Sequence, residues 1–382
     1  MRSESVLSDV LEQLGARGLL RVPDDGTGRS RVAENAARLG LPLLDASSND
    51  YLGLAGSSVS RETTAKAGAA ASRLVYGTAP EHLELEAALA SWVGTESALL
   101  FPSTYSANLG LVAALGVEGS LILSDAANHA SLIDGARLAK AEVAVVPHLD
   151  LNAMESLLRR GRAAKACWVL TESYFSMDGD SPDLHALRAL CDAHDASLIV
   201  DEAHALGVFG PAGAGLCAQL GVRPDILVGA LGKAVGTHGG FVAGSEVLHK
   251  YLWNRARSFV FSTAISPAHA QLTLAHVLEL RAADPLRAAL QSNTRLLRDR
   301  LQAARLRLIA NAAGPIISVV LGESSKALNA ASRLRDVGIL AQAIRPPTVP
   351  DGSARLRLTV KATFRKDEIE RLSKAVADAC RE

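Results

Sequence analysis

Short apolar runs alternate with longer amphipathic segments through most of the chain, which predicts strands that are each followed by a helix. The predicted strands cover residues 97–101, 120–124, 142–147, 166–171, 197–200 and 226–231. The predicted helices between them cover residues 81–93, 109–115, 151–158 and 184–194. This alternation predicts an α/β fold with a largely parallel sheet and helices on both of its faces.

The two ends of the chain follow different patterns. Residues 5–20 form an amphipathic stripe that predicts an N-terminal helix, and a turn-rich linker (23–28) and a short strand (41–45) follow. A long helical region (268–306) with a break at Pro285 precedes predicted strands and helices that build a small C-terminal α/β domain. These last elements cover residues 316–321, 324–336, 354–360 and 366–380. The expected organisation is an N-terminal helix and arm (1–45), a large domain (46–280) and a small domain (281–382).

Composition narrows the class of protein. Of 382 residues, 48% are hydrophobic, and 40 basic side chains balance 40 acidic ones, so a basic surface for nucleic acid or membrane is not expected. The four scattered cysteines have no zinc or redox spacing, so no metal is expected. The N-terminus lacks the apolar core of a signal peptide, and the most apolar long window (98–117) contains Pro102 and several polar residues. A soluble, cytoplasmic protein is the expectation.

Lys233 stands directly after a buried apolar run and a glycine. Gly236, Gly239 and Gly240 follow it, so its amine is held at a tight turn. Partial removal from water disfavours the ammonium form and makes the amine nucleophilic enough to form a Schiff base. A surface lysine at the edge of a loop is the simpler interpretation of this stretch alone.

Asp201 changes that balance because it lies at the carboxyl end of the preceding predicted strand, with His204 three residues later. In a parallel sheet, ligands bind beyond the carboxyl ends of the strands, so Asp201, His204 and Lys233 are expected in one crevice. A carboxylate that keeps a pyridine nitrogen protonated and a lysine that forms an imine are the pair that pyridoxal 5′-phosphate (PLP) requires. The sequence therefore favours PLP chemistry.

Three other polar stretches follow predicted strands and could reach the same crevice. Residues 103–108 open a helix, where hydroxyls and amides suit a phosphate, although an ordinary helix cap explains them equally well. His129 could stack on a planar cofactor or be structural. Residues 171–182 form the third stretch. Residues 47–54 are too polar for the core and either line a site or form a plain loop.

Arg355 and Arg357 alternate with leucines in a predicted strand and therefore point to one face. Two arginines on one face can clamp a carboxylate through forked hydrogen bonds. A solvated strand face is the alternative.

An ordered set of short motifs resembles the α-oxoamine synthase family of PLP enzymes. The resemblance covers nearly the whole chain from residue 41 onward. Its landmarks are Ser48-Asn-Asp-Tyr-Leu-Gly-Leu, His129-Ala-Ser-Leu, Phe175-Ser-Met-Asp-Gly-Asp, Asp201-Glu-Ala-His, Gly232-Lys and Phe261-Ser-Thr. Arg345-Pro-Pro-Thr-Val-Pro and Arg355-Leu-Arg-Leu-Thr resemble the branch that acts in biotin biosynthesis. The resemblance implies the aspartate aminotransferase-like fold of type I, in which the large domain binds PLP.

The resemblance also implies roles for individual residues. Lys233 would bond to the PLP aldehyde and move the substrate's α-proton, Asp201 would pair with the ring nitrogen, and His129 would stack on the ring. The other cofactor-binding residues implied are Ser176 and His204 at the ring oxygen, and Thr104, Tyr105 and the partner subunit's Ser262 and Thr263 at the phosphate. The substrate-binding residues implied are Arg21, Asn49, Arg345, Thr348 and Arg357. A homodimer with shared sites is implied as well.

The implied reaction is the decarboxylative condensation of L-alanine with a pimeloyl thioester, carried by coenzyme A or by a carrier protein. A different amino acid or acyl thioester, as in 2-amino-3-ketobutyrate ligase, is the alternative within the family. An aminotransferase on the same fold and a non-enzymatic PLP-fold regulator are the alternatives outside it.

The sequence departs from the family pattern at the expected phosphate site. Thr104 stands where the family usually has glycine, and Ala230 stands where it has a hydroxyl side chain. Without that hydroxyl, one charge-assisted hydrogen bond of about 1.5–3 kcal/mol has to come from another group. Tyr76 stands where a small residue is expected. The alanines at 69–71 stand where the family has a more glycine-rich stretch.

Overall fold

The computed structural model describes residues 2–17, 19–20, 27–58, 64–309 and 313–381, which divide into two compact units. The large unit comprises Asn49–Ser176 and Asp180–Ala289. The small unit comprises Met1–Ser48, Met177–Gly179 and Leu290–Glu382. Among the described residues, no helix has the length and apolar character needed to cross a bilayer.

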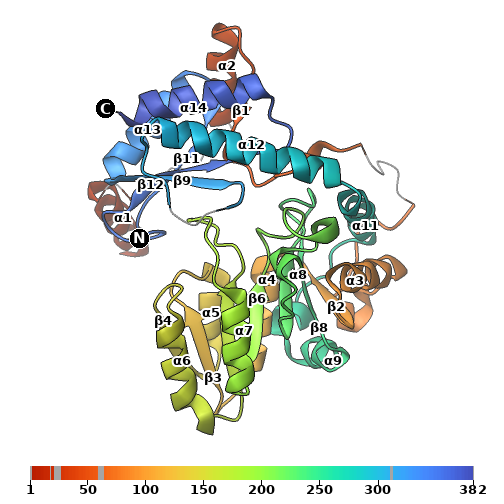
Figure 1. Ribbon diagram of the computed structural model, residues 1–382. Coiled ribbons are helices and arrows are strands. Elements are labelled where there is room, and N and C mark those ends of the chain that lie inside the picture. Colours follow the sequence, from red (N-terminus) through yellow and green to blue (C-terminus); the bar gives the residue numbers. More distant parts are fainter. Residues whose placement is uncertain (1, 18, 21–26, 59–63, 310–312, 382) are drawn as a thin grey trace. The chain divides into compact units, whose positions relative to one another are not determined.

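The large unit is built on a seven-stranded sheet with the spatial order β2-β8-β7-β6-β5-β3-β4 (Figure 1). Its strands are β2 (Ser97–Phe101), β3 (Leu121–Asp125), β4 (Glu142–Val146), β5 (Cys167–Glu172), β6 (Ser197–Asp201), β7 (Ile226–Ala230) and β8 (Gly240–Gly244). Strands β3 to β7 are parallel, whereas β8 is antiparallel to both of its neighbours. Parallel strands that helices cover on both faces consist of consecutive apolar residues. These apolar runs are the pattern from which the parallel strands were predicted. Strand β8 was not predicted, because the glycines at both of its ends are typical of a turn.

Helices cover both faces of this sheet (Figure 1). They are α3 (Pro80–Val93), α4 (Thr104–Leu115), α5 (Ala130–Leu138), α6 (Leu151–Arg160), α7 (Leu184–Ala193), α8 (Leu216–Leu220), α9 (Glu246–Arg255), α10 (Arg257–Val260) and α11 (Pro267–Arg281). Short helical turns occur at Leu54–Gly56, Arg73–Gly77, Gly161–Ala163 and Pro211–Gly213. One continuous core joins the sheet to α4, α5, α9 and α10, with Leu111 and Phe259 among its fully buried members. Burial of such side chains stabilises each by about 1.5–3 kcal/mol.

Helix α4 begins at Thr104, earlier than the predicted start at 109. Ser103 is its N-cap, and its hydroxyl accepts a hydrogen bond from the amide of Ser106 at 3.0 Å. The hydroxyl of Ser106 accepts from the amide of Ser103 at 3.1 Å in return. This reciprocal capping satisfies amides that a helix start would otherwise leave unpaired, so the polar stretch forms the first turns of the helix.

The small unit combines a three-stranded antiparallel sheet, in the order β11-β12-β9, with a parallel pair of short strands, β1 and β10. The strands are β1 (Leu44–Asp45), β9 (Ile316–Gly322), β10 (Ile339–Leu340), β11 (Gln342–Ile344) and β12 (Ala354–Thr359). The helices are α1 (Arg2–Ala16), α2 (Thr27–Arg38), α13 (Ser324–Asp336), α14 (Lys366–Cys380) and most of α12 (Asp284–Ala303). Helix α2 was not predicted, because Val32 and Ala36 are its only buried hydrophobic side chains among the described ones and give a weak periodic signal. The predicted linker at 23–28 lies mostly outside the described residues.

Candidate active site

The carboxyl ends of the parallel strands of the large unit carry acidic side chains. Strand β3 ends at Asp125, β5 at Glu172 and β6 at Asp201. Glu172 is the direct register partner of Asp201 across the β5–β6 pair. Ligands of open α/β sheets bind at this edge, and two adjacent carboxyl groups there concentrate titratable chemistry in one place.

Asp201 is 5% exposed, and its carboxylate is held from two sides. The amide of Ala203 donates to Oδ1 at 2.8 Å, and Nδ2 of Asn108 donates to Oδ2 at 2.7 Å. Asn108 comes from α4, and its Nδ2 also donates to the hydroxyl of Ser131 on α5 at 2.9 Å. A buried carboxylate fixed by donors from two other elements has a defined orientation, as a ring-nitrogen partner requires.

Lys233 lies half-buried in the loop between β7 and β8. The loop is closed by hydrogen bonds from the Leu231 amide to the Gly239 carbonyl at 3.0 Å and from the Gly236 amide to the Lys233 carbonyl at 2.9 Å. Gly236 has φ 76°, and a Cβ at this position would lie 2.6 Å from the amide nitrogen of Ala55. A glycine is therefore required here, and the tight loop fixes the backbone of Lys233.

The charge of Lys233 acts on two neighbours of Asp201. Burial, reinforced by the Asp201 carboxylate, raises the pKa of Glu172 to about 8, and the Lys233 ammonium opposes this rise. The pKa of His129 is held below its ordinary value, first because its imidazole is partly withdrawn from water and also because Lys233 is positive. The amide of His129 donates to Oε1 of Glu172 at 2.7 Å. Lys233, Glu172, Asp201 and His129 thus form one electrostatically connected group.

Glu172→Gln should change the pH dependence of stability in the cofactor-free protein. The folded-state pKa of Glu172 (about 8) exceeds the ordinary 4.5, so ionisation of this carboxyl opposes folding increasingly as the pH rises between these two values. Glutamine keeps an acceptor for the His129 amide and removes this penalty. The melting temperature of the variant, relative to the native protein, should therefore rise from pH 5 to pH 8. Glu84→Gln, the same change on an exposed face of α3, controls for the loss of one charge, and an equal trend in both variants would contradict the assignment.

His204 is buried in the turn after β6, where its Nδ1 lies 2.6 Å from the hydroxyl of Tyr51. Tyr51 is fully buried, so the expectation that residues 47–54 are too polar for the core was wrong at this position. Ser176 follows β5, and its amide donates to the carboxyl of Glu172. Ser176 therefore joins the group around Asp201 and Glu172, whereas the contact shown for His204 is with Tyr51.

The predicted phosphate-binding residues lie at the beginning of α4 and after α10. Among the described residues, no acceptor faces the amides of Thr104 and Tyr105, as is usual for the first amides of a helix. The Tyr105 ring makes an edge contact with the His129 ring at 6.2 Å between centroids. Ser262 and Thr263 line a small hollow with Phe101 and Pro102, which directly precede α4. Two open amides at a helix N-terminus suit an anion.

The predicted substrate-binding residues divide between the two units. Asn49 is half-buried in the large unit, whereas Arg345, Thr348 and Arg357 belong to the small unit. Arg21 lies outside the described residues. Arg357 is 3% exposed and donates to the hydroxyl of Thr359 at 3.3 Å.

Arg355 shares the burial of Arg357, and its guanidinium is ion-paired with Asp178 within the small unit. The alternative of a solvated strand face was therefore wrong, and Arg355 is already engaged by a carboxylate.

Asn108, Glu172 and Tyr51 were not predicted as site residues, although each lies in a polar stretch that was singled out. Each contacts a predicted residue: Asp201, His129 and His204 respectively. A polar side chain within an apolar segment, such as Asn108 in α4, was the available signal. Its partner could not be identified from the sequence, because the contact joins residues 93 positions apart.

Comparisons with known proteins agree with this architecture. The pattern of a family described as aminotransferase class I and II matches residues 42–376. An 8-amino-7-oxononanoate synthase from Anaeromyxobacter dehalogenans (strain 2CP-C) is 46% identical, over 96% of this chain and 94% of that protein. Among solved structures, a serine palmitoyltransferase from Sphingomonas wittichii has a TM-score of 0.84 and 30% identity, covering 89% of this chain and 88% of that one. An 8-amino-7-oxononanoate synthase from Francisella tularensis has a TM-score of 0.75 and 26% identity, covering 88% and 97%. The predicted fold class is confirmed.

Proposed function

Because the chain belongs to the aminotransferase class I and II family, we propose that it is a PLP-dependent acyltransferase that condenses L-alanine with a pimeloyl thioester. The products would be 8-amino-7-oxononanoate, carbon dioxide and the free thiol. The observation that carries the proposal is the buried Asp201 carboxylate, held by Asn108 and Ala203 beside a group that includes Lys233. The name shared by several relatives at 40–46% identity supports the substrate class.

The residues of the large unit fit PLP. Asp201 would pair with the ring nitrogen, Lys233 would hold the aldehyde carbon, and His129 would lie against the ring. The open amides of Thr104 and Tyr105 would accept the phosphate at the N-terminus of α4, where the helix dipole favours negative charge. The Thr104 hydroxyl donates to the Gly239 carbonyl at 3.5 Å, so the two backbone amides, rather than the hydroxyl that Ala230 lacks, would supply donors for the phosphate.

PLP, when bound, supplies an aldehyde that bonds to amines and a protonated ring that stabilises negative charge on the substrate's α-carbon. The chain's own groups supply the rest. The Nζ of Lys233 would remove the α-proton of alanine and later return a proton. Asp201 would keep the ring nitrogen protonated, and the tight 231–239 loop would position Lys233 for this proton transfer.

The bond changes balance. A carbon–carbon bond forms between the α-carbon of alanine and the thioester carbonyl carbon, and the carbon–sulfur bond breaks to release the thiol. The former alanine carboxylate then leaves as carbon dioxide, and one proton is added at the α-carbon. Asn49 and Arg357 are proposed to orient the alanine carboxylate, and Arg21, Arg345 and Thr348 to contact the acyl chain.

An assay that varies the amino acid tests this assignment. Purified protein saturated with PLP should release thiol and carbon dioxide from L-alanine and pimeloyl-CoA, with 8-amino-7-oxononanoate identified by mass spectrometry. The serine palmitoyltransferase likeness makes L-serine with palmitoyl-CoA the competing pair, and glycine with acetyl-CoA tests a third family activity. Faster turnover with either competing pair would overturn the proposed substrates, and an oxoacid formed from alanine alone would indicate an aminotransferase.

A homodimer is part of the proposal, with Ser262 and Thr263 of each subunit completing the phosphate site of the other. Light scattering should therefore give twice the chain mass of 40.0 kDa. A cytoplasmic location also remains a prediction.

A further inference from the structure

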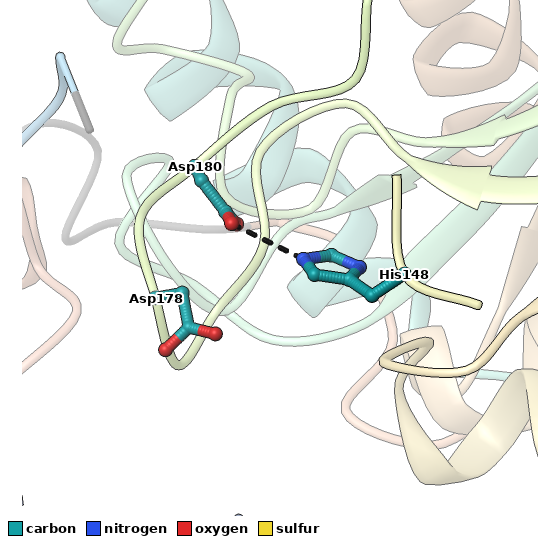
Figure 2. Close-up of side chains that lie close together, drawn as sticks. All are labelled: His148, Asp178 and Asp180. Atoms are coloured by element: carbon teal, nitrogen blue, oxygen red, sulfur yellow. Dashed lines mark hydrogen bonds and ion pairs between the residues drawn. The ribbon is translucent and has the colours of Figure 1, made fainter. Parts of the chain in front are cut away.

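His148 lies in the large unit and is not one of the predicted site residues. It follows β4 after Pro147, and both of its ring nitrogens contact carboxylates. Nδ1 lies 2.7 Å from Oδ1 of Asp125, at the end of β3, and Nε2 lies 3.1 Å from Oδ2 of Asp180, in the loop after β5 (Figure 2). The imidazole therefore links two segments that are far apart in the sequence.

Two protons on the His148 imidazole satisfy both of its carboxylate partners. The amides of Ala127 and Leu149 also donate to the Asp125 carboxylate, at 2.8 and 3.0 Å, so this group acts only as an acceptor. A neutral imidazole has one N–H and could satisfy only one of its two carboxylate partners. Burial alone would lower the pKa of His148, but the hydrogen bonds to Asp125 and Asp180 outweigh burial and raise the pKa to about 9.

The second partner, Asp180, fixes the loop that follows β5. Asp180 is 8% exposed, and its Oδ1 has no hydrogen-bond partner among the described residues, so this buried charge relies on His148. The Asp180 carbonyl accepts from the amide of Phe175 at 2.9 Å, and the Phe175 ring packs edge-on against His148 at 4.5 Å. Ser176 follows Phe175 directly, and its amide donates to Glu172, the register partner of Asp201.

Asp178 also lies in this loop (Figure 2), and its carboxylate is ion-paired with Arg355 in the small unit. A histidine and two aspartates could in principle ligate a metal. With both imidazole nitrogens donating to carboxylates, His148 has no lone pair to offer, so the arrangement is an ion-pair clamp. The charged groups that face His148 are Asp125 from β3, Asp180 from the loop and, within 4.8 Å, Asp178.

We propose that His148 is a positioning residue whose imidazolium clamps Asp180 to Asp125 and thereby holds Ser176 against Glu172 at the edge of the cofactor site. The catalytic importance of this edge rests on the proposed function, whereas the clamp itself does not depend on any ligand. A residue at the cofactor site keeps the geometry that catalysis needs when charged hydrogen bonds from the residues behind it fix its position.

The first test follows protonation directly. In native protein saturated with PLP and labelled with ¹⁵N-histidine, both nitrogens of His148 should show the imidazolium shift at pH 7.5 and titrate near pH 9. His148→Gln identifies the resonance, and His185→Gln, the same change on an exposed position of α7, is the matched control. Titration of His148 near 6.5 would overturn the clamp, whether or not the protein has the proposed activity.

The second test measures thermal stability as a function of pH. A folded-state pKa raised from 6.5 to about 9 gives stabilisation that is fully present below pH 6.5 and lost as the pH rises through 9. The melting-temperature difference between native protein and His148→Gln should therefore shrink over this range. If His148→Gln does not fold, Asp180→Asn removes the other partner and should show the same trend; a difference independent of pH would overturn the clamp.

Turnover separates positioning from general stability. In His148→Gln, kcat should fall about 10-fold or more, the equivalent of losing one charge-assisted hydrogen bond. In a Ser176→Ala background, which lacks the hydroxyl implied at the ring oxygen, the same change should cost much less, because His148 then has no Ser176 hydroxyl to position. Independent, multiplicative effects would contradict the route through Ser176. Absence of any turnover in native protein would refute the proposed function and leave the titration tests of the clamp intact.

Discussion

Lys233→Ala should abolish turnover and leave the fold intact. The amine is the proposed general base and the proposed point of attachment for the cofactor aldehyde. Loss of acid–base catalysis alone lowers kcat by about 10²–10⁴-fold. Loss of the attachment should in addition weaken PLP binding and remove the cofactor's long-wavelength absorbance. Lys233 is half-buried and its ammonium opposes the rise in the pKa of Glu172, so losing this charge should lower the melting temperature of the cofactor-free protein without unfolding it.

The matched control is Lys165→Ala. Lys165 is exposed and precedes β5 at the opposite edge of the sheet, where its Nζ donates to the carbonyl of Glu118 at 3.3 Å. This variant should keep native absorbance and turnover. Retained turnover in Lys233→Ala, or an equal loss in the control, would remove the basis for placing the chemistry at the end of β7.

Asp201→Asn should give the second large loss. Asparagine has nearly the same shape but cannot hold a positive charge on the ring nitrogen. The loss of one buried charge-assisted hydrogen bond of about 1.5–3 kcal/mol corresponds to a fall in kcat of about 10- to 150-fold as a minimum. Asparagine also has to accept from both Asn108 and Ala203 with a single oxygen, so the position of its amide is disturbed as well.

Asp225→Asn is the comparison for this change. Asp225 lies just before β7, at the amino ends of the strands, where its Oδ2 accepts from the Leu198 amide and from Arg188, both at 2.7 Å. Its loss should lower the melting temperature and leave the cofactor's spectrum unchanged. Asp201→Asn with native kcat and spectrum would show that this carboxylate does not face the cofactor ring.

The sequence predicted those helices and strands whose own residues carry a clear hydrophobic pattern. The runs in β5, β6 and β7 are apolar enough to mark buried strands, and the 324–336 and 366–380 patterns coincide with α13 and α14. Strand β8 has a weaker signal, because its buried apolar run covers only residues 241–243 and lies between glycines that predict a turn. Helix α2 is stabilised by contacts on a narrow face that its polar sequence does not display.

For the candidate site, the sequence identified residues that act through position at a strand end, and it missed those that act through long-range contacts. Asp201 and Lys233 follow apolar runs and could be placed at one edge of the sheet from topology alone. Asn108, Glu172 and His148 contact partners 93, 43 and 32 residues away. Such pairings are set by how the strands are ordered in space, which alternation does not specify.

The most direct test of the account is to trap the bond between the chain and its cofactor. Native protein saturated with PLP would be reduced with borohydride, digested and mapped by mass spectrometry, with Lys233→Ala and Lys165→Ala treated in parallel. The account predicts one pyridoxyl group per chain on Lys233, present in the Lys165→Ala protein and missing from Lys233→Ala. A label on another lysine, or none on the native protein, would contradict it.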